Sequence, residues 1–499
     1  GTLGGTGTIL FSTDFDHNLA IDGNTTLTIA SGITVRGNRG TIGIAVFTGG
    51  NNVLINQGTI RADAANPSGI NIIADSTTNT GTIGAITGGT LTIGGAWSNA
   101  GGTLLVNAAI LNLGGTFQMT GVGAFNRTAG TVNLTGTVTG GAGDTLNLNA
   151  STGTWVMNGG HISGGTVTMS GGAGLTVTTN SNNRLSGVTV NGNIDLAITS
   201  ATLRVAGGFT LNGTVTVSGN SANLVFDSTG TLGGSGTILF SGEFDHNLGI
   251  DGNTTLTVGP GITIRGNRGT IGIAVFTGGN NALINQGAII SDTSNLTGIN
   301  INADVFTNQG TIVARTSGKL TITPAVGTPV ALTNSGTIVV GSLGVIRVNG
   351  NFVQTAAGTF RVEISGIAQP HVGKLVITGT AALDGTFATV GVPGFFSTCM
   401  NVEVLTAATV NGQFTLNDFV SPPIGFQSIA VYPPNTDTVR FAISQLSDWN
   451  EDGLLNSQDF FDFIASFFAQ SPEADFNNDG FINSQDLFDF VSSFFTPCP

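Results

Sequence analysis

The chain has 499 residues, enough for several domains or one long repeat array, and 78 of them are glycine while only 8 % are charged. Hydrophobic residues nevertheless make up 40 % of the chain, which excludes a disordered low-complexity protein. The net charge is −14 and no basic stripe occurs, so nucleic acid is not expected as a partner. No run of about 20 apolar residues is present, so no membrane span is predicted.

A long duplication dominates the first 300 residues. The segment GTLGGTGTILF at Gly1 returns as GTLGGSGTILF at Gly230, and the two copies stay closely similar for about 50 residues at an offset of 229. Copy two follows strand-like sequence, whereas copy one begins abruptly at the same point. We therefore expect further residues upstream of Gly1, and the lack of a signal peptide does not argue against secretion.

A shorter unit recurs inside each copy, with INQGTI at Ile55, TNTGTI at Thr78, INQGAI at Ile284 and TNQGTI at Thr307. The spacing is about 20 to 26 residues, which is typical of repeat arrays. We expect Asn and Gly to supply the left-handed backbone of a corner, and the alternating apolar and polar residues after it to form a strand. The pattern predicts a mainly β protein, a right-handed parallel β-helix (solenoid) of about 17 rungs over residues 1–365.

One other architecture fits short strands with little helix signal. An antiparallel sandwich array would also give many short strands, but its turn signals normally recur every 8–12 residues. The repeat in this chain is about twice as long, which favours the solenoid.

Residues 366–445 keep strand-like patterns but lose the Asn-Gly repeat. This segment resembles the β-rich closing segment of large secreted bacterial solenoids and autotransporter-like passengers. We expect it to form a β-rich cap that covers the last rung, where unpaired backbone groups would otherwise be exposed. The two cysteines of the chain are Cys399 and Cys498, and both a bridge between them and two separately used thiols fit the sequence.

The last segment, residues 446–499, carries ten acidic residues and no Lys or Arg from Asp448 onward. Two twelve-residue loops, 448–459 and 475–486, place oxygen-bearing side chains at positions 1, 3, 5, 9 and 12 and Gly at position 6. This is the ligand plan of an EF-hand loop, in which the main-chain carbonyl of position 7 also binds Ca²⁺. Two calcium ions are predicted, with these ligands: Asp448, Asn450, Asp452, Leu454, Asn456 and Asp459, then Asp475, Asn477, Asp479, Phe481, Asn483 and Asp486.

These loops closely resemble the dockerin type I family, which has two such loops, Asp at position 12 and one helix after each loop. The helices correspond to FFDFIASFFAQ after Asp459 and LFDFVSSFF after Asp486. In that family, loop positions 10 and 11 help to select the cohesin partner. The resemblance therefore implies partner-binding roles for Ser457, Gln458, Ser484 and Gln485, and the identical pairs imply binding in two orientations.

The two helices hold nine Phe residues, more than a two-helix module can easily bury, so some are expected to face a partner or the neighbouring cap. The Phe-rich helices and the Cys-Pro ending also resemble dockerin-like tails of Planctomycetes-type secreted proteins. Cohesin-like proteins or other surface proteins are therefore both candidate partners.

One acidic cluster lies within the solenoid region. Asp14, Asp16 and His17 are matched in copy two by Glu243, Asp245 and His246, and the segments RGNRG supply Arg36, Arg39, Arg265 and Arg268. Carboxylates on one face of a β-helix can act on polysaccharides. The cluster is duplicated with everything around it, however, which favours a structural role.

Two functions follow from these features. The first is a secreted, non-catalytic β-helical rod, a spacer or adhesin, which a Ca²⁺-dependent dockerin anchors to a cell surface or a protein partner. The alternative is a dockerin-bearing polysaccharide lyase or glycoside hydrolase of the β-helix type. The sequence singles out no catalytic residues for it, and Asp16 and Asp245 are its test positions.

Overall fold

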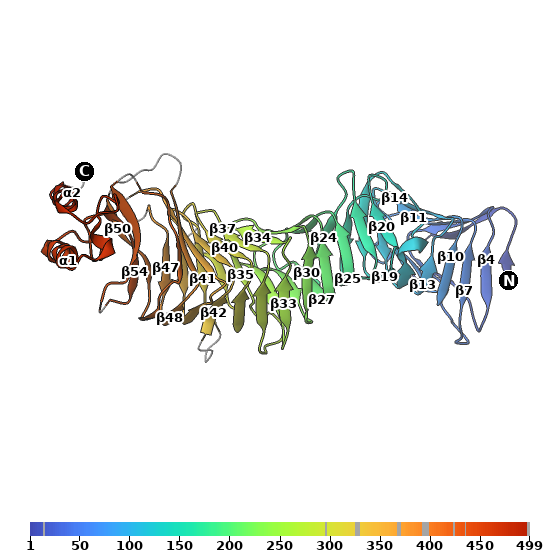
Figure 1. Ribbon diagram of the computed structural model, residues 1–499. Coiled ribbons are helices and arrows are strands. Elements are labelled where there is room, and N and C mark those ends of the chain that lie inside the picture. Colours follow the sequence, from blue (N-terminus) through green and yellow to red (C-terminus); the bar gives the residue numbers. More distant parts are fainter. Residues whose placement is uncertain are drawn as a thin grey trace. The chain divides into compact units, whose positions relative to one another are not determined.

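The structure is a computed structural model that describes residues 1–12, 15–294, 297–324, 330–366, 371–391, 399–422, 425–434 and 436–496. The protein is mainly β, a parallel β-solenoid of about 16 turns with two α-helices at its C-terminal end (Figure 1). The predicted solenoid is therefore confirmed, and the antiparallel sandwich array is excluded because successive turns pair through parallel strands.

The chain forms two compact units. The first consists of residues 1–263 and 274–279, and the second of residues 264–273 and 280–499. The division of the sequence at residues 365 and 445 stays a prediction.

The first unit is built from stacks in which each turn adds one strand. One stack contains β1 (Thr2–Leu3), β4 (Thr26–Ile29), β7 (Val53–Asn56), β10 (Ser76–Asn79), β13 (Ala96–Ser98), β16 (Thr116–Gln118), β19 (Thr137–Thr139), β22 (His161–Ser163), β25 (Arg184–Asn191), β27 (Thr202–Leu211), β29 (Ala222–Phe226) and β32 (His246–Ile250). A second contains β2 (Gly7–Phe11), β5 (Ile33–Gly37), β8 (Thr59–Ala62), β11 (Thr82–Ile86), β14 (Thr103–Asn107) and β17 (Ala124–Arg127). A third contains β3 (Asn18–Leu19), β6 (Gly40–Ile42), β9 (Ile70–Ile72), β12 (Thr90–Ile93), β15 (Ala109–Leu113), β18 (Gly130–Leu134), β21 (Trp155–Met157), β24 (Leu175–Val177), β26 (Ile194–Leu196), β28 (Thr214–Val217) and β31 (Thr237–Phe240). The long strands β25 and β27 also pair into a stack with β20 (Thr145–Leu148), β23 (Thr166–Met169), β30 (Gly230–Gly234) and β33 (Thr255–Val258).

The second unit repeats this plan with three stacks. The first contains β35 (Arg268–Ile271), β38 (Gly298–Ile301), β41 (Lys319–Ile322), β44 (Val345–Val348), β47 (Lys374–Ile377) and β50 (Met400–Thr406). The second contains β36 (Ala282–Asn285), β39 (Val305–Asn308), β42 (Val330–Asn334), β45 (Asn351–Gln354), β48 (Thr380–Leu383) and β51 (Thr409–Gly412). The third contains β34 (Thr263–Gly266), β37 (Ala288–Ser291), β40 (Thr311–Ala314), β43 (Thr337–Val340), β46 (Thr359–Ile364), β49 (Thr386–Gly391) and β52 (Leu416–Asp418).

Alternation of apolar and polar residues fixes which side of each strand is buried. In β40 and β43, Ile312 and Ile338 are register partners and both are fully buried. Parallel pairing in register places such side chains above one another about 4.8 Å apart. The interior is therefore a set of apolar columns, and a shift of one residue would turn a whole column outward.

Buried amide side chains form hydrogen-bonded ladders at strand ends. In the second unit, Asn285 Nδ2 donates to Asn308 Oδ1 (2.8 Å), Asn308 Nδ2 donates to Asn334 Oδ1 (2.7 Å), and Asn334 Nδ2 donates to Gln354 Oε1 (2.7 Å). All four side chains are buried. Because each amide donates in one direction, the ends of the ladder lack a partner: Asn285 Oδ1 and Gln354 Nε2 are buried without a hydrogen bond. In the first unit, Asn56 donates to Asn79 in the same way.

This arrangement corrects the role that we expected for the Asn-x-Gly repeat. Neither Asn308 nor Gly310 has a positive φ, and the same holds for Asn79 and Gly81, so the repeat does not supply left-handed backbone. Asn is instead required as a ladder amide. Gly is required for space, because a Cβ on Gly310 would lie 2.2 Å from a backbone oxygen of the preceding turn.

The C-terminal end of the solenoid changes its strand pairing. Parallel pairing continues to β51 and β52, and β50 also pairs antiparallel with β54 (Thr438–Gln445), which pairs antiparallel with β53 (Phe426–Val431). Beyond β54 lie the helices α1 (Ser457–Phe468) and α2 (Ser484–Phe494) (Figure 1). Short 3₁₀ turns occur at Met119–Gly121 and Pro472–Ala474.

Candidate calcium and docking site

The first carboxylate of each loop accepts a hydrogen bond from the glycine at position 6. Gly453 N–H donates to Asp448 Oδ2 (3.0 Å), and Gly480 N–H donates to Asp475 Oδ2 (2.8 Å). Both glycines have a positive φ, of 77° and 87°, which permits the sharp bend at this point. The two loops thus begin with the same turn.

Positions 3 and 5 continue the same pattern of side chains that accept from nearby backbone. Asn450 Oδ1 accepts from Asp452 N–H (3.0 Å), and Asp452 Oδ1 accepts from Leu454 N–H (2.8 Å). The second loop has the equivalent bonds, from Asp479 N–H to Asn477 and from Phe481 N–H to Asp479. The backbone of each loop is therefore held in a curve by its own oxygen-bearing side chains.

Loop positions 9 and 12, the last two predicted ligands, form the start of each helix. Asn456 is the N-cap of α1, and its side chain accepts from Gln458 N–H (2.8 Å) while Asp459 accepts from Asn456 N–H (2.8 Å). Asn483 and Asp486 form the same capping box at α2. Two orphan N–H groups of each helix are thereby satisfied, which stabilises a helix start by about 1 kcal/mol.

Asp459 and Asp486 also connect each helix to the beginning of its loop. Asp459 Oδ1 accepts from Asn450 N–H (3.2 Å), and Asp486 Oδ1 accepts from Asn477 N–H (3.3 Å). Burial raises the pKa of Asp486, but the backbone N–H groups around it outweigh this effect and hold that pKa below its ordinary value. The carboxylate at position 12 of the second loop is therefore kept ionised by the fold.

The donor set of the loops fits a hard cation. Each loop offers three carboxylates, two amide oxygens and one main-chain carbonyl, the oxygen ligands that Ca²⁺ prefers. Asp448 Oδ1 is buried without a hydrogen-bond partner, which is costly for a carboxylate oxygen that no cation accompanies. Among the described residues, no group of three or more His, Cys, Asp or Glu side chains is placed so that it could hold a metal ion. The fit therefore rests on the chemistry of the donors and on Asp448 Oδ1.

The electrostatics of Asp448 also favour a cation beside this carboxylate. Burial raises the pKa of this carboxyl to about 6, and the neighbouring carboxylates of Asp459 and Asp452 contribute to the rise. The hydroxyl of Ser444 offsets part of it but makes no hydrogen bond of normal geometry with Asp448. Like charges crowd this end of the chain, and no basic residue follows Asp448 in the sequence to balance them.

The core of the helical module repeats itself at a spacing of 27 residues. Phe463 of α1 and Phe490 of α2 are fully buried and stack with their ring centroids 3.9 Å apart. Trp449 and Phe476, each at position 2 of its loop, both pack against this cluster. The two loop–helix units are thus packed around one aromatic pair.

Other Phe side chains of the helices face solvent, and contact of some of them with a partner stays a prediction. Phe461 of α1 is 63 % exposed and its counterpart Phe488 of α2 is 65 % exposed. Phe468 and Phe495 form a second exposed pair with the same spacing of 27 residues. The module therefore presents the same exposed Phe side chains twice, once from each of its two loop–helix units.

The four residues that the resemblance assigns to partner binding open the two helices. Ser457 and Gln458 are exposed in the first turn of α1, and Ser484 and Gln485 are exposed in the first turn of α2. Each glutamine donates to an aspartate one turn later, Gln458 to Asp462 (2.7 Å) and Gln485 to Asp489 (2.9 Å). The two surfaces therefore match in sequence and in local geometry.

The module is hydrogen-bonded to the antiparallel strands beside it. Asn401 of β50 donates to the Gly453 carbonyl of the first loop (3.1 Å), and Gln445 of β54 donates to the Thr496 carbonyl after α2 (2.6 Å). Cys399, just before β50, is disulfide-bonded, and Cys498 lies outside the described residues.

Several residues of the acidic cluster in the solenoid contact neighbouring side chains. Asp16 is 71 % exposed in its side chain and pairs with Arg39 (2.8 Å), whereas Arg36 pairs with Asp63 (2.6 Å). His17 stacks on Phe11. Asp14 lies outside the described residues. In the second copy, His246 is buried and stacks on Phe240, and Arg265 pairs with Asp292.

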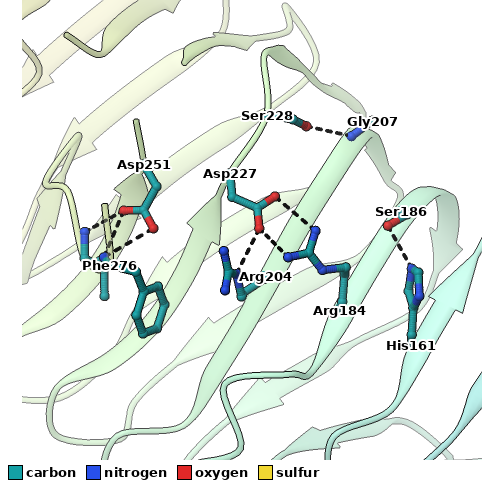
Figure 2. A network of polar contacts seen from close by, with 10 residues as sticks. His161, Arg184, Ser186, Arg204, Gly207, Asp227, Ser228, Asp251 and Phe276 are labelled. Carbon is teal, nitrogen blue, oxygen red and sulfur yellow. Dashed lines mark hydrogen bonds and ion pairs between the residues drawn. The ribbon is translucent and has the colours of Figure 1, made fainter. Parts of the chain in front are cut away.

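One polar cluster was not identified from the sequence. Arg184, Arg204 and Asp227 are 20 and 23 residues apart in the chain, yet they meet on three successive turns (Figure 2). Each spacing equals about one turn of the solenoid. An alignment of successive repeats could therefore have placed these three residues next to one another.

The fold and these sites define a parallel β-solenoid protein with a helical C-terminal module. No protein-family model and no curated protein matches the chain. None of the described helices has the length and apolar character needed to cross a membrane.

Proposed function

We propose that the chain is a secreted, non-catalytic β-helical spacer or adhesin that a Ca²⁺-dependent dockerin-type module anchors to a cell surface or a protein partner. In this proposal, residues 446–499 are the dockerin-type module and bind two calcium ions through the twelve ligand residues of the two loops. We also propose a right-handed winding of the solenoid, because strand–crossover–strand connections between parallel strands are right-handed in nearly all proteins.

One observation carries the calcium part of the proposal. Two loops that are 27 residues apart repeat the same hydrogen bonds from loop backbone N–H groups to the proposed ligand side chains, and both end in the same capping box. Accidental acidic turns would have no reason to agree in this detail. A bound Ca²⁺ would supply the positive charge that these carboxylates lack and would join the start of each loop to its helix.

The docking part is supported by the exposed surface of the helices. Exposed apolar side chains that are rimmed by polar residues commonly mark protein interaction sites. Phe461 and Phe488 occupy matching places on α1 and α2, beside the exposed Ser-Gln pairs. A cohesin-like or other surface protein with an apolar groove would fit either half of this surface.

Secretion is supported by the bonded state of Cys399. Structural disulfides persist in oxidising compartments and are rare in reducing ones. The proposed location is therefore extracellular, in association with a cell surface.

Calcium titration of the full chain tests the proposal. Isothermal titration calorimetry should find two calcium ions bound per chain. The double variant Asp459→Ala with Asp486→Ala should bind neither ion. The matched control is Asp462→Asn with Asp489→Asn, which changes two carboxylates outside the ligand positions and should leave both ions bound. A chain that binds no calcium, or a control that loses it equally, would refute the assignment.

A further inference from the structure

A column of basic side chains runs across neighbouring turns of the first unit. His161 of β22, Arg184 of β25 and Arg204 of β27 are successive register partners. Parallel strands lie about 4.8 Å apart, so the two arginines meet as like charges, which is unfavourable without an anion between them. The fold provides one in Asp227, which follows β29.

Asp227 holds both arginines in place. Arg184 donates to it through Nη2 (2.7 Å) and Nη1 (3.4 Å), and Arg204 donates through Nε (2.9 Å), as Figure 2 shows. A guanidinium group has five N–H donors. Arg204 uses only Nε in hydrogen bonds with the described residues, so its two η nitrogens keep their donors for another acceptor.

These groups line a surface cavity of about 430 Å³. Two arginines and two aspartates line it, so the formal charges balance. The arginine side chains are more exposed than the aspartates, however. The side chains of Arg184 and Arg204 are 32 % and 26 % exposed, whereas Asp227 is 8 % and Asp251 is 4 % exposed. A ligand that enters the cavity therefore contacts the guanidinium groups more than the carboxylates.

An aromatic ring is fixed beside the arginines. Asp251 accepts hydrogen bonds from the backbone N–H groups of Val275 (2.6 Å) and Phe276 (3.2 Å), which positions this loop. The Phe276 ring is 46 % exposed, and the Arg204 guanidinium lies 5.1 Å from its centroid (Figure 2). Phe276 does not itself line the cavity, but the next residue, Thr277, does, so the ring lies beside the cavity and against Arg204.

We infer that this cavity binds an acidic sugar unit of a polysaccharide. The η nitrogens of Arg204 donate to the carboxylate, since planar N–H donors match carboxylate geometry, and the Arg184 guanidinium adds positive charge beside it. The ring of Phe276 packs against the C–H face of the sugar. This site would give the solenoid an adhesive function that is independent of the calcium module.

The chain contains matched controls for both parts of the site. Arg36 and Arg61 share Asp63 in the way that Arg184 and Arg204 share Asp227, and Asp63 is likewise 8 % exposed. Of these four arginines, however, Arg204 is the one with a ring over its guanidinium. The loop of Phe276 also recurs in the first copy, where Asp22 accepts from Phe47 N–H (2.8 Å).

Binding of oligogalacturonate to the full chain tests the inference. Calorimetry in calcium-free buffer should detect binding of the free acid, while the fully methyl-esterified oligomer, which has the same sugars without charge, should not bind. Arg204→Gln should weaken binding about 10- to 100-fold, because it removes charge-assisted hydrogen bonds. Phe276→Ala should weaken binding about three- to tenfold.

The control variants Arg61→Gln and Phe47→Ala should bind like the parent chain, and circular dichroism should confirm that all variants keep the β fold. No binding of the acid, equal binding of the ester, or equal losses in the controls would each overturn the inference. Because the assay omits calcium, its failure is separate from a failure of calcium-dependent docking. Sulfated dextran serves as a further arm, and binding stronger than that of the uronate would overturn the carboxylate assignment.

Discussion

Replacement of Asn308 by alanine should destabilise the second unit far more than any change on its surface. Asn308 is fully buried and takes part in two amide–amide bonds, as donor to Asn334 and as acceptor from Asn285. The variant leaves Asn334 Oδ1 buried without this donor, whereas Asn285 Nδ2 keeps its bonds to the carbonyls of Gly287 and Thr311. An unsatisfied buried polar group costs about 1–3 kcal/mol, so we expect a loss of that size.

The neighbouring residue provides the control. Gln309 takes part in an exposed amide ladder, in which it accepts from Gln286 (3.0 Å), and Gln309→Ala should change stability by no more than about 0.5 kcal/mol.

Hydrogen exchange is the suitable assay, because stability in a repeat array is largely local. Backbone amides of β39 and the turns next to it should exchange faster in Asn308→Ala than in the parent chain. In Gln309→Ala their exchange rates should not change. Equal exchange in both variants would show that the ladder does not stabilise the solenoid.

Three further predictions concern single positions. Gly310→Ala should lower the melting temperature of the second unit, because its Cβ would lie 2.2 Å from a backbone oxygen and overpacking costs about 1–3 kcal/mol. Phe463→Ala should destabilise the helical module by about 3–5 kcal/mol in denaturation followed by tryptophan fluorescence, whereas exposed Phe461→Ala should have almost no effect. Burial and the charge of Arg184 lower the pKa of His161 from 6.5, so stability should fall as the pH drops below about 6.5, and His161→Asn should remove this part of the pH dependence of melting.

Each of these predictions has a contrary outcome. An unchanged melting temperature for the glycine variant would mean that the backbone moves aside at little cost. Equal effects of the two phenylalanine variants would contradict the single aromatic core. A parent chain and histidine variant with the same pH dependence would show that the imidazole titrates as it does in the unfolded chain.

Much of the fold could be predicted because its information is local. Alternating residues in segments such as Thr90–Ile93 decide which side chains are buried, and a repeat of about 20 residues leaves each turn room for short strands only. The loop oxygens at 448–459 and 475–486 are local in the same sense, since one loop contains a complete donor set.

The reason for the Asn-x-Gly repeat could not be read from the sequence. Asn and Gly are common in turns with left-handed backbone, and this association led to the wrong explanation. Their actual roles depend on residues one turn away: Asn308 needs the amides of Asn285 and Asn334, and Gly310 needs the space next to the preceding turn. Such contacts exist only once the turns are stacked.

By itself, the sequence determined that the chain is a stack of short parallel strands, that its acidic end consists of two like loops, and that its helices have more Phe than they can bury. The tertiary structure alone decided which Phe side chains are exposed, and it alone brought Arg184, Arg204 and Asp227 together. The physical reason is the register between turns. Register is set by pairing over the whole stack, and it determines which of the residues about 20 positions apart become neighbours.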